Sequence, residues 1–185
     1  MIKRIFDILS SLFALILLGV FILVFYILAT IANRANGLFV QERIGQFGKI
    51  FRIFKIKTIK NNTTEISRFG KFLRKSKIDE LPQLWNVLIG DMSIVGPRPD
   101  IAGYYDKLEG ENRKILDLKP GLTSLASIKY ANEDEILSKQ ENPQQYNDEV
   151  IFPDKIKMNL EYYYKQSILL DLQIIFKTIF RYNNF

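Results

Sequence analysis

The chemistry open to this chain is limited first by the residue types that it lacks. Among its 185 residues there is no His and no Cys. The sequence therefore excludes imidazole bases, Ser-His-Asp triads, His-ligated zinc, thiol nucleophiles, disulfides and iron–sulfur clusters. If the protein is an enzyme, it must work with carboxylates, Lys, Arg and hydroxyl groups, or with a metal ion bound through oxygen.

Two adjacent carboxylates, Asp79 and Glu80, are the most economical candidates for such chemistry. They precede an apolar run typical of a helix, and a helix N-terminus stabilises negative charge and offers backbone N–H groups to phosphate. The flanking Arg74, Lys75 and Lys77 are expected to keep Asp79 ionised and to attract an anionic substrate. A carboxylate can attack phosphorus to form an acyl phosphate, commonly with Mg²⁺ on the phosphate oxygens. Taken alone, an Asp-Glu pair before an apolar run is more often a structural cap.

A further candidate is Arg98, which stands between two prolines in the sequence GPRP of residues 96–99. Two prolines so close together exclude regular structure, so the pattern predicts a rigid turn that presents the guanidinium group. A fixed guanidinium group suits bidentate binding of phosphate. A structural salt bridge at a turn would have the same sequence, and local reasoning leaves both interpretations open.

The segment Leu9–Ala32 has no charged residue and is dominated by Leu, Ile, Phe and Val. As a helix it would rise about 36 Å, more than the roughly 30 Å of a bilayer's hydrocarbon core, so the sequence predicts a membrane segment. Lys3 and Arg4 precede this segment and further basic residues follow it, which disfavours a single crossing. A helix that breaks near Gly19 and returns would keep both flanks on one side. From these residues alone, a single crossing and a re-entrant helix are equally acceptable.

The rest of the sequence predicts the elements that must position the candidate side chains. Residues 39–58 indicate two short strands around a glycine-containing turn. Residues 68–78 form a basic amphipathic stretch, typical of an interfacial helix, although a solvated face over a soluble core has the same pattern. Residues 132–149 are acidic and polar and predict a surface loop with some helix. Residues 155–181 predict an amphipathic helical end that covers the core or lies on the membrane.

The charge is distributed unevenly along the chain, whose net charge is +6. Residues 1–100 contain 15 basic and 7 acidic side chains, whereas residues 101–185 contain 11 basic and 13 acidic side chains. A basic half indicates a polyanionic partner or an anionic membrane surface. The adjoining membrane segment favours the membrane surface, and we expect no nucleic-acid partner.

Five strings occur in a fixed order along the first two thirds of the chain: KRIFDIL, QERIG, FKIKT, LRKSKIDELPQLWNVLIGDMSIVGPRP and KPGLTSLA. A further pattern, Y-Y…S…L-D…I…T, follows over Tyr162–Thr178. Together these strings resemble the bacterial sugar transferases, and more closely the small monotopic phosphoglycosyl transferases that initiate glycoconjugate assembly. The long block that contains DELPQL, GDMS and GPRP is specific enough to make chance agreement negligible.

The resemblance implies a reaction and a role for each candidate residue. Enzymes of that family transfer a phosphosugar from a nucleotide diphosphate sugar, usually UDP-linked, to polyprenyl phosphate and release UMP. The resemblance implies a ping-pong mechanism with Mg²⁺ as cofactor, in which Asp79 attacks the β-phosphorus and carries a covalent phosphosugar. Glu80 would be its partner, assisting the acceptor or the metal, so both carboxylates are candidate Mg²⁺ ligands. Arg98 and Arg74 would bind phosphate, and Lys57 would line the site.

The resemblance also implies an α+β fold, mostly helical, with a small β-hairpin, a re-entrant membrane helix and interfacial amphipathic helices. It divides the chain into a membrane-inserted segment, residues 1–36, and a membrane-associated catalytic domain, residues 37–185, on the cytoplasmic face of the bacterial inner membrane. The expected partners are a UDP-sugar of the N-acetylated hexosamine type, polyprenyl (undecaprenyl) phosphate, membrane lipids and downstream glycosyltransferases.

The chain also departs from the family in two places that bear on these expectations. The family usually breaks its membrane helix with Ser-Pro, where this chain has Gly19-Val20. Residues 129–160 lack the family's common Asn-Gly-Arg loop and are longer and acidic, and we expect this region to contribute to the choice of sugar or nucleotide. A function of a different class is a non-catalytic, membrane-anchored scaffold of a glycan assembly complex. The presence of Asp79, Glu80 and Arg98 together argues against that alternative.

Overall fold

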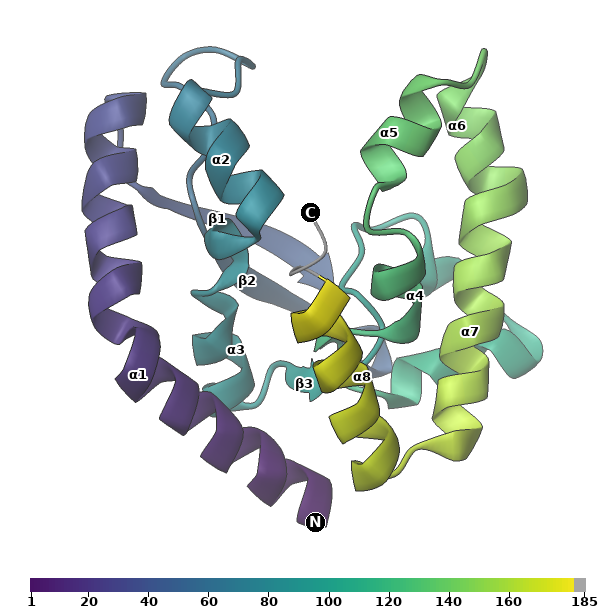
Figure 1. Ribbon diagram of the computed structural model, residues 1–185. Coiled ribbons are helices and arrows are strands. Elements are labelled where there is room, and N and C mark those ends of the chain that lie inside the picture. The colour runs from purple at the N-terminus through teal and green to yellow at the C-terminus, as the bar shows by residue number, and fades with distance from the viewer. Residues whose placement is uncertain (182–185) are drawn as a thin grey trace. The chain divides into compact units, whose positions relative to one another are not determined.

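The computed structural model describes residues 1–181 and divides into two compact units. The first unit contains residues 1–43 and 50–94, and the second contains residues 44–49 and the chain from residue 95 onward. Most of the described chain is helical, and the strands form two small two-stranded sheets, β1–β2 and β3–β4 (Figure 1). The predicted α+β fold with a small hairpin is therefore confirmed.

The first unit holds the membrane-type segment, the hairpin and the two adjacent carboxylates. Its elements in chain order are α1 (Ile2–Asn33), β1 (Leu38–Ile44), β2 (Ile50–Ile56), α2 (Arg68–Ser76) and α3 (Gln83–Ile89). β1 and β2 pair with each other, as predicted from two short strands around a glycine-containing turn in residues 39–58.

Helix α1 turns most of its large apolar side chains outward. Its buried residues are polar or small, namely Asp7, Ser11, Ala29 and Asn33, whereas many of its Leu, Ile, Val and Phe side chains are exposed. This is the only described helix long and apolar enough to cross a membrane, judged by length and composition. A soluble core helix would bury its apolar face, so the pattern supports contact with lipid.

The break expected at Gly19 is absent, because α1 continues through this residue as one helix. Figure 1 shows that the helix bends along its length instead. A Gly inside a helix costs only about 1 kcal/mol relative to Ala, and an unbroken helix keeps every backbone group hydrogen-bonded in an apolar medium. A re-entrant path, which stays a prediction, would have to use the bend and not a break at Gly19.

Charged side chains tie the N-terminal end of α1 to the chain around α3. The Arg4 guanidinium group donates to the carbonyl oxygens of Val87 (2.6 Å) and Leu88 (2.7 Å), near the end of α3. Asp7 Oδ1 accepts from the Ser93 hydroxyl and the Ile94 N–H, both at 3.0 Å. The charges before the apolar segment therefore position α1 on the first unit.

The side chain of Asn86, on α3, forms hydrogen bonds with the free backbone edge of β2, as a neighbouring strand would. Its Nδ2 donates to the Arg52 carbonyl oxygen (2.7 Å), and its Oδ1 accepts from the Phe54 N–H (3.2 Å). The side chain is fully buried, and its amide satisfies two backbone groups on β2 that a third strand would otherwise pair. This contact holds β2 against α3, which follows the two carboxylates directly.

The second unit contains the GPRP turn and the acidic C-terminal part of the chain. Its helices and strands are the end of β3 (Ser93–Val95), then β4 (Gly121–Thr123), α4 (Leu125–Lys129), α5 (Glu133–Ser138), α6 (Pro143–Tyr146), α7 (Phe152–Lys165) and α8 (Ile168–Arg181). A π-helical turn, Asn147–Ile151, joins α6 to α7. The predicted surface loop over residues 132–149 is thus mostly short helices.

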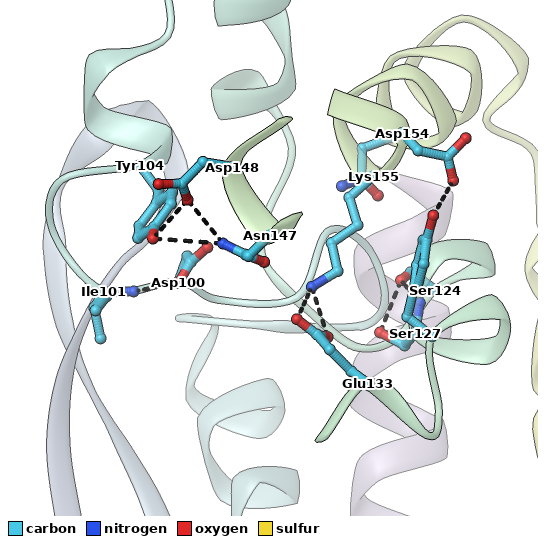
Figure 2. A network of polar contacts seen from close by, with 12 residues as sticks. Asp100, Ile101, Tyr104, Ser124, Ser127, Glu133, Asn147, Asp148, Asp154 and Lys155 are labelled. Carbon is cyan, nitrogen blue, oxygen red and sulfur yellow. Dashed lines mark hydrogen bonds and ion pairs between the residues drawn. The ribbon is translucent and has the colours of Figure 1, made fainter. Parts of the chain in front are cut away.

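Two polar networks organise the acidic region of this unit (Figure 2). In the first, Lys155 Nζ lies 2.7 Å from both carboxylate oxygens of Glu133. In the same network, Asp154 accepts from Lys129 Nζ and from the Tyr130 hydroxyl, each at 2.7 Å. The second network joins Tyr104 to Asn147 and Asp148 across the chain. The first group of contacts joins α4 and α5 to α7, and the second joins Tyr104 to the π-helical turn.

Helix α8 has the reverse of the pattern expected for a soluble amphipathic helix. The residues on its inward face are Asp171, Ile174 and Thr178, of which the first two are fully buried. Its outward face is apolar, with Leu169 exposed by 68% and Phe176 by 61%. An exposed apolar stripe of this kind is typical of an interfacial helix, one of the two roles predicted for this segment.

Candidate active site

The adjacent carboxylates Asp79 and Glu80 lie in a short 3-10 turn between α2 and α3, and both are largely buried, with 7% and 9% of their surface exposed. Lys77, just before the turn, adopts a left-handed backbone conformation with φ of 56° and turns the chain away from α2. Helix α3 begins only at Gln83, after Pro82. The interpretation of Asp79 as the cap of that helix is therefore wrong, because Asp79 lies inside the 3-10 turn and α3 begins four residues later without a side-chain cap.

The charge state of Asp79 is governed by burial. Desolvation, and after it the charge of Glu80, raises the pKa of Asp79 from 3.8 to about 6, while Lys55, Lys77 and Arg74 lower it. The flanking Lys77 and Arg74 lower the pKa of Asp79 as expected, but the cost of taking a carboxylate out of water outweighs them. At neutral pH most Asp79 side chains are still ionised, with a pKa close enough to 7 for acid–base or nucleophilic work.

Two buried polar side-chain atoms in and just after this turn lack a hydrogen-bond partner within the described chain. They are Asp79 Oδ1 and, four residues later, Gln83 Nε2. An acceptor and a donor that are buried without partners cost folding free energy, and such groups call for a functional explanation. An ionised oxygen without hydrogen bonds is also a better nucleophile than one that is already engaged, which fits the role predicted for Asp79.

Lys55 is the site residue that the sequence did not reveal. Its Nζ forms a 3.2 Å ion pair with Glu80 Oε1, and both side chains are mostly buried. It also acts on Asp79, whose pKa it lowers. The available signal was the predicted strand itself, since Lys55 and Lys57 are two residues apart in the segment 39–58 and such residues share a face of an extended chain, although β2 ends at Ile56.

The other predicted basic residues of the first unit have different positions. Arg74, on the last turn of α2, donates from Nε to the Thr58 hydroxyl (2.9 Å) and is close enough to lower the pKa of Asp79. Lys57 is half-buried, and its hydrogen bonds are made by its backbone, with its N–H donating to the Gly37 carbonyl oxygen (2.6 Å). The structure thus brings Arg74 into the field of the carboxylates, while the predicted role of the Lys57 side chain stays a prediction.

Arg98 belongs to the second unit, where it is half-buried on the turn that follows β3. Its positive charge acts on the buried Tyr105, opposing the burial that raises the pKa of that phenol. The turn is irregular, as its two prolines predict.

The two carboxylates of the first unit are also the candidate metal ligands. Within residues 1–181, no group of three or more His, Cys, Asp and Glu side chains is placed to hold a metal ion. Mg²⁺ often needs only one or two carboxylates, because substrate phosphates and water complete its coordination. The unpartnered Oδ1 of Asp79 and the neighbouring Glu80 fit that requirement.

The sequence of residues 1–184 matches the family model described as bacterial sugar transferase. The chain belongs to this family. A glucose-1-phosphate transferase from Klebsiella pneumoniae, named for UDP-glucose and undecaprenyl phosphate, is 32% identical over 97% of this chain and 39% of its own length. An exopolysaccharide production protein from Rhizobium leguminosarum bv. phaseoli is 32% identical over 96% of this chain and 92% of its own length.

A third relative, from Aeromonas hydrophila, is named as a UDP-N-acetylgalactosamine-undecaprenyl-phosphate N-acetylgalactosaminephosphotransferase. It is 31% identical over 96% of this chain and 43% of its own length. The chain spans about two fifths of the length of several curated relatives that it matches. It therefore corresponds to one part of those larger proteins.

Proposed function

We propose that this protein is a phosphoglycosyl transferase that moves a sugar 1-phosphate from a UDP-sugar to undecaprenyl phosphate or a similar polyprenyl phosphate. The products are the polyprenyl-diphosphate-sugar and UMP. Membership in the bacterial sugar transferase family and the names of the relatives support the reaction. The observation that carries the mechanism is the buried Asp79, whose pKa is about 6 and whose Oδ1 has no hydrogen-bond partner in the described chain.

The reaction would proceed by two displacements at one phosphorus atom. An oxygen of ionised Asp79 attacks the β-phosphorus of the UDP-sugar, and a new O–P bond forms. The bond from that phosphorus to the bridging oxygen breaks, and UMP leaves with the electron pair. The phosphate oxygen of the polyprenyl acceptor then attacks the same phosphorus and displaces Asp79, which regains its carboxylate.

The neighbouring side chains would balance the charges of these steps. Lys55, Lys77 and Arg74 keep a large fraction of Asp79 ionised in spite of its burial. Their positive charges would also attract the diphosphate, which burial alone would repel. Glu80, paired with Lys55, is positioned beside the nucleophile and could hold a metal ion together with it. Bound Mg²⁺ would supply neutralisation of the phosphate oxygens.

The sugar of the donor differs among the relatives. One relative is named for N-acetylgalactosamine and another for glucose, so the relatives' names include both kinds of sugar. We favour a donor of the N-acetylated hexosamine type. Residues 129–160, which contain many of the polar contacts of Figure 2, are the region in which this chain departs from the family pattern and in which a preference could be set.

A location at the cytoplasmic face of the bacterial inner membrane agrees with the exposed apolar surfaces. Helix α1 exposes a long apolar surface, and α8 exposes a shorter one. The acceptor is a lipid, and a nucleotide sugar is a water-soluble cytoplasmic compound, so the reaction must take place at such a boundary. Downstream glycosyltransferases would then extend the lipid-linked sugar.

The proposal is tested by release of UMP from detergent-solubilised protein with Mg²⁺, undecaprenyl phosphate and a panel of UDP-sugars. Asp79→Asn is compared with wild type, and Glu109→Gln, which changes an exposed carboxylate outside the candidate site and outside residues 129–160, is the matched control. We expect lipid-dependent release in wild type and in the control, and none in Asp79→Asn. Release that persists in Asp79→Asn would refute the covalent step. If the folded wild-type protein released no UMP with any UDP-sugar of the panel, the result would favour the non-catalytic scaffold.

A further inference from the structure

Arg98 is held on a turn whose backbone is pressed against a second turn, residues 119–121. The Gly96 N–H donates to the Thr123 carbonyl oxygen (3.0 Å), and the Gly121 N–H donates to the Pro97 carbonyl oxygen (2.7 Å). A Cβ atom added to Gly121 would lie 2.1 Å from the Gly96 nitrogen, so only glycine permits this approach. The position of the guanidinium group therefore depends on how β3 and β4, the strands next to these turns, are held.

The end of β3 is held by two buried side chains from α7 and α8. The Tyr162 hydroxyl lies 2.5 Å from Asp171 Oδ1 and 3.3 Å from the Val95 carbonyl oxygen. A hydroxyl has one proton, so the two acceptors share it in a three-centre hydrogen bond whose shorter arm goes to Asp171 and whose longer arm goes to Val95. Tyr162 is 4% exposed and Asp171 is fully buried. Val95 directly precedes Gly96, so this contact reaches the first residue of the Arg98 turn.

β4 is held by a hydroxyl relay to the same helix. Thr178 donates to the Ile174 carbonyl oxygen (2.8 Å) within α8. Its oxygen lies 2.7 Å from the Thr123 hydroxyl, which must then be the donor of that second hydrogen bond. Asp171, Ile174 and Thr178 lie on one face of α8, so a single helix face holds both strands.

None of these buried polar groups takes part in the steps proposed above. A buried acidic side chain is costly unless it is well paired, and apolar residues would pack the same space without that cost. Hydrogen bonds, however, specify one register between a helix and a strand, which apolar contacts do not. The polar inward face of α8 is therefore better explained by positioning than by stability.

We propose that Tyr162, Asp171 and Thr178 are positioning residues for donor binding, because they hold the two strands that set the Arg98 turn. A guanidinium group that is already held in place loses less conformational entropy when phosphate binds. Binding of the donor is then tighter, and its KM is lower. This inference rests on the proposed role of Arg98 in binding the donor phosphate. It goes further, because it assigns a task to the Y-Y…S…L-D…I…T pattern of residues 162–178.

The first measurement is amide hydrogen exchange of the full-length protein in detergent, in wild type and in Tyr162→Phe. Peptides that contain the Gly96 and Gly121 amides report directly on the two turns. We expect exchange there to be about tenfold faster in Tyr162→Phe, the effect of losing the hydrogen bond to the Val95 carbonyl oxygen. Tyr163→Phe is the matched control, since its hydroxyl is 3.4 Å from Asp117 at the surface.

The second measurement is the steady-state rate of UMP release. Tyr162→Phe should raise KM for the UDP-sugar about tenfold and leave kcat within about twofold. Thr178→Val should have the same effect on the same parameter, and Thr178→Ser, which keeps the hydroxyl, should restore it. In an Arg98→Ala background, Tyr162→Phe should raise KM no further, because the group that it positions is gone.

The possible results separate this inference from the proposed reaction. Equal exchange of the Gly96 and Gly121 amides in Tyr162→Phe and Tyr163→Phe would overturn the inference, whatever the activity. Faster exchange with an unchanged KM would also overturn it, since the turn would be loosened without consequence for the donor. If wild type released no UMP, the proposed reaction would fail and the role in donor binding would fall with it. The exchange data would still decide whether these side chains hold the turn.

Discussion

Replacing Asp79 by Asn is expected to make the folded protein more stable at neutral pH, although it removes the proposed nucleophile. Burial and the charge of Glu80 raise the pKa of Asp79 from 3.8 to about 6 in the folded state. Ionisation of Asp79 therefore favours the unfolded chain, in which the carboxylate is hydrated. The difference between 3.8 and about 6 corresponds to about 3 kcal/mol at a pH above both values. Asn carries no charge, so the variant avoids most of this cost.

The dependence on pH distinguishes this explanation from a general packing effect. Well below pH 3.8, Asp79 is protonated in the folded and the unfolded protein, and its cost is absent. Between 3.8 and about 6 the folded protein keeps a proton that the unfolded chain has lost, so the unfolding free energy of wild type falls as pH rises. Above about pH 6 the full cost is present. The advantage of Asp79→Asn should be largest at neutral pH and small near pH 4.

The assay is thermal unfolding in detergent at about pH 7.5 and about pH 4. For a chain of this size, a gain of about 2–3 kcal/mol raises Tm by about 5–10 °C. Asp134→Asn, at an exposed position, should change stability by less than about 0.5 kcal/mol at either pH. A Tm of Asp79→Asn at or below that of wild type at pH 7.5 would refute the burial argument. An advantage that persists undiminished at pH 4 would refute its electrostatic origin.

Three other contacts lead to measurable outcomes. Lys55→Met should shift the acidic limb of kcat/KM for UMP release, near pH 6 in wild type, to higher pH, because the ammonium group lowers the pKa of Asp79; an unmoved limb would contradict this. Asn86→Ala should cost about 2–4 kcal/mol of unfolding free energy, because it leaves two backbone groups of β2 unpaired, and a loss below about 1 kcal/mol in thermal unfolding would argue against that pairing. Since the chain has no Cys, Leu172→Cys can be labelled with an environment-sensitive fluorophore. Its emission should shift to the blue in vesicles and be quenched by spin-labelled lipid, whereas equal behaviour of a label at Asp134→Cys would show that α8 does not contact the membrane.

Features that depend on neighbouring residues were predictable from the sequence. The apolar run of α1, the glycine-containing turn of the hairpin and the prolines around Arg98 act over a few residues, and the structure contains each element. Helix α1 is not broken at Gly19, because a single Gly disturbs a helix too little to interrupt it. Asp79 does not cap α3, because this helix begins only after Pro82.

Features that depend on distant residues were not predictable in the same way. Lys55 reaches Glu80 only because β2 is held against α3, partly by Asn86. The inward face of α8 is polar because it meets the ends of β3 and β4, and nothing in the spacing of its residues indicates those strands. Pairings of this kind follow from packing between elements far apart in the chain.

Composition and local pattern by themselves determined that the protein lacks imidazole and thiol chemistry, has an apolar segment of membrane length, and carries an adjacent Asp-Glu pair among basic residues. These properties are independent of how the chain packs. Only the tertiary structure decided the state of Asp79, whose pKa rises in spite of the nearby cations. The reason is physical: the cost of burying a charge depends on how much water is excluded around it, and that is set by the folded neighbours and not by the residues next in sequence.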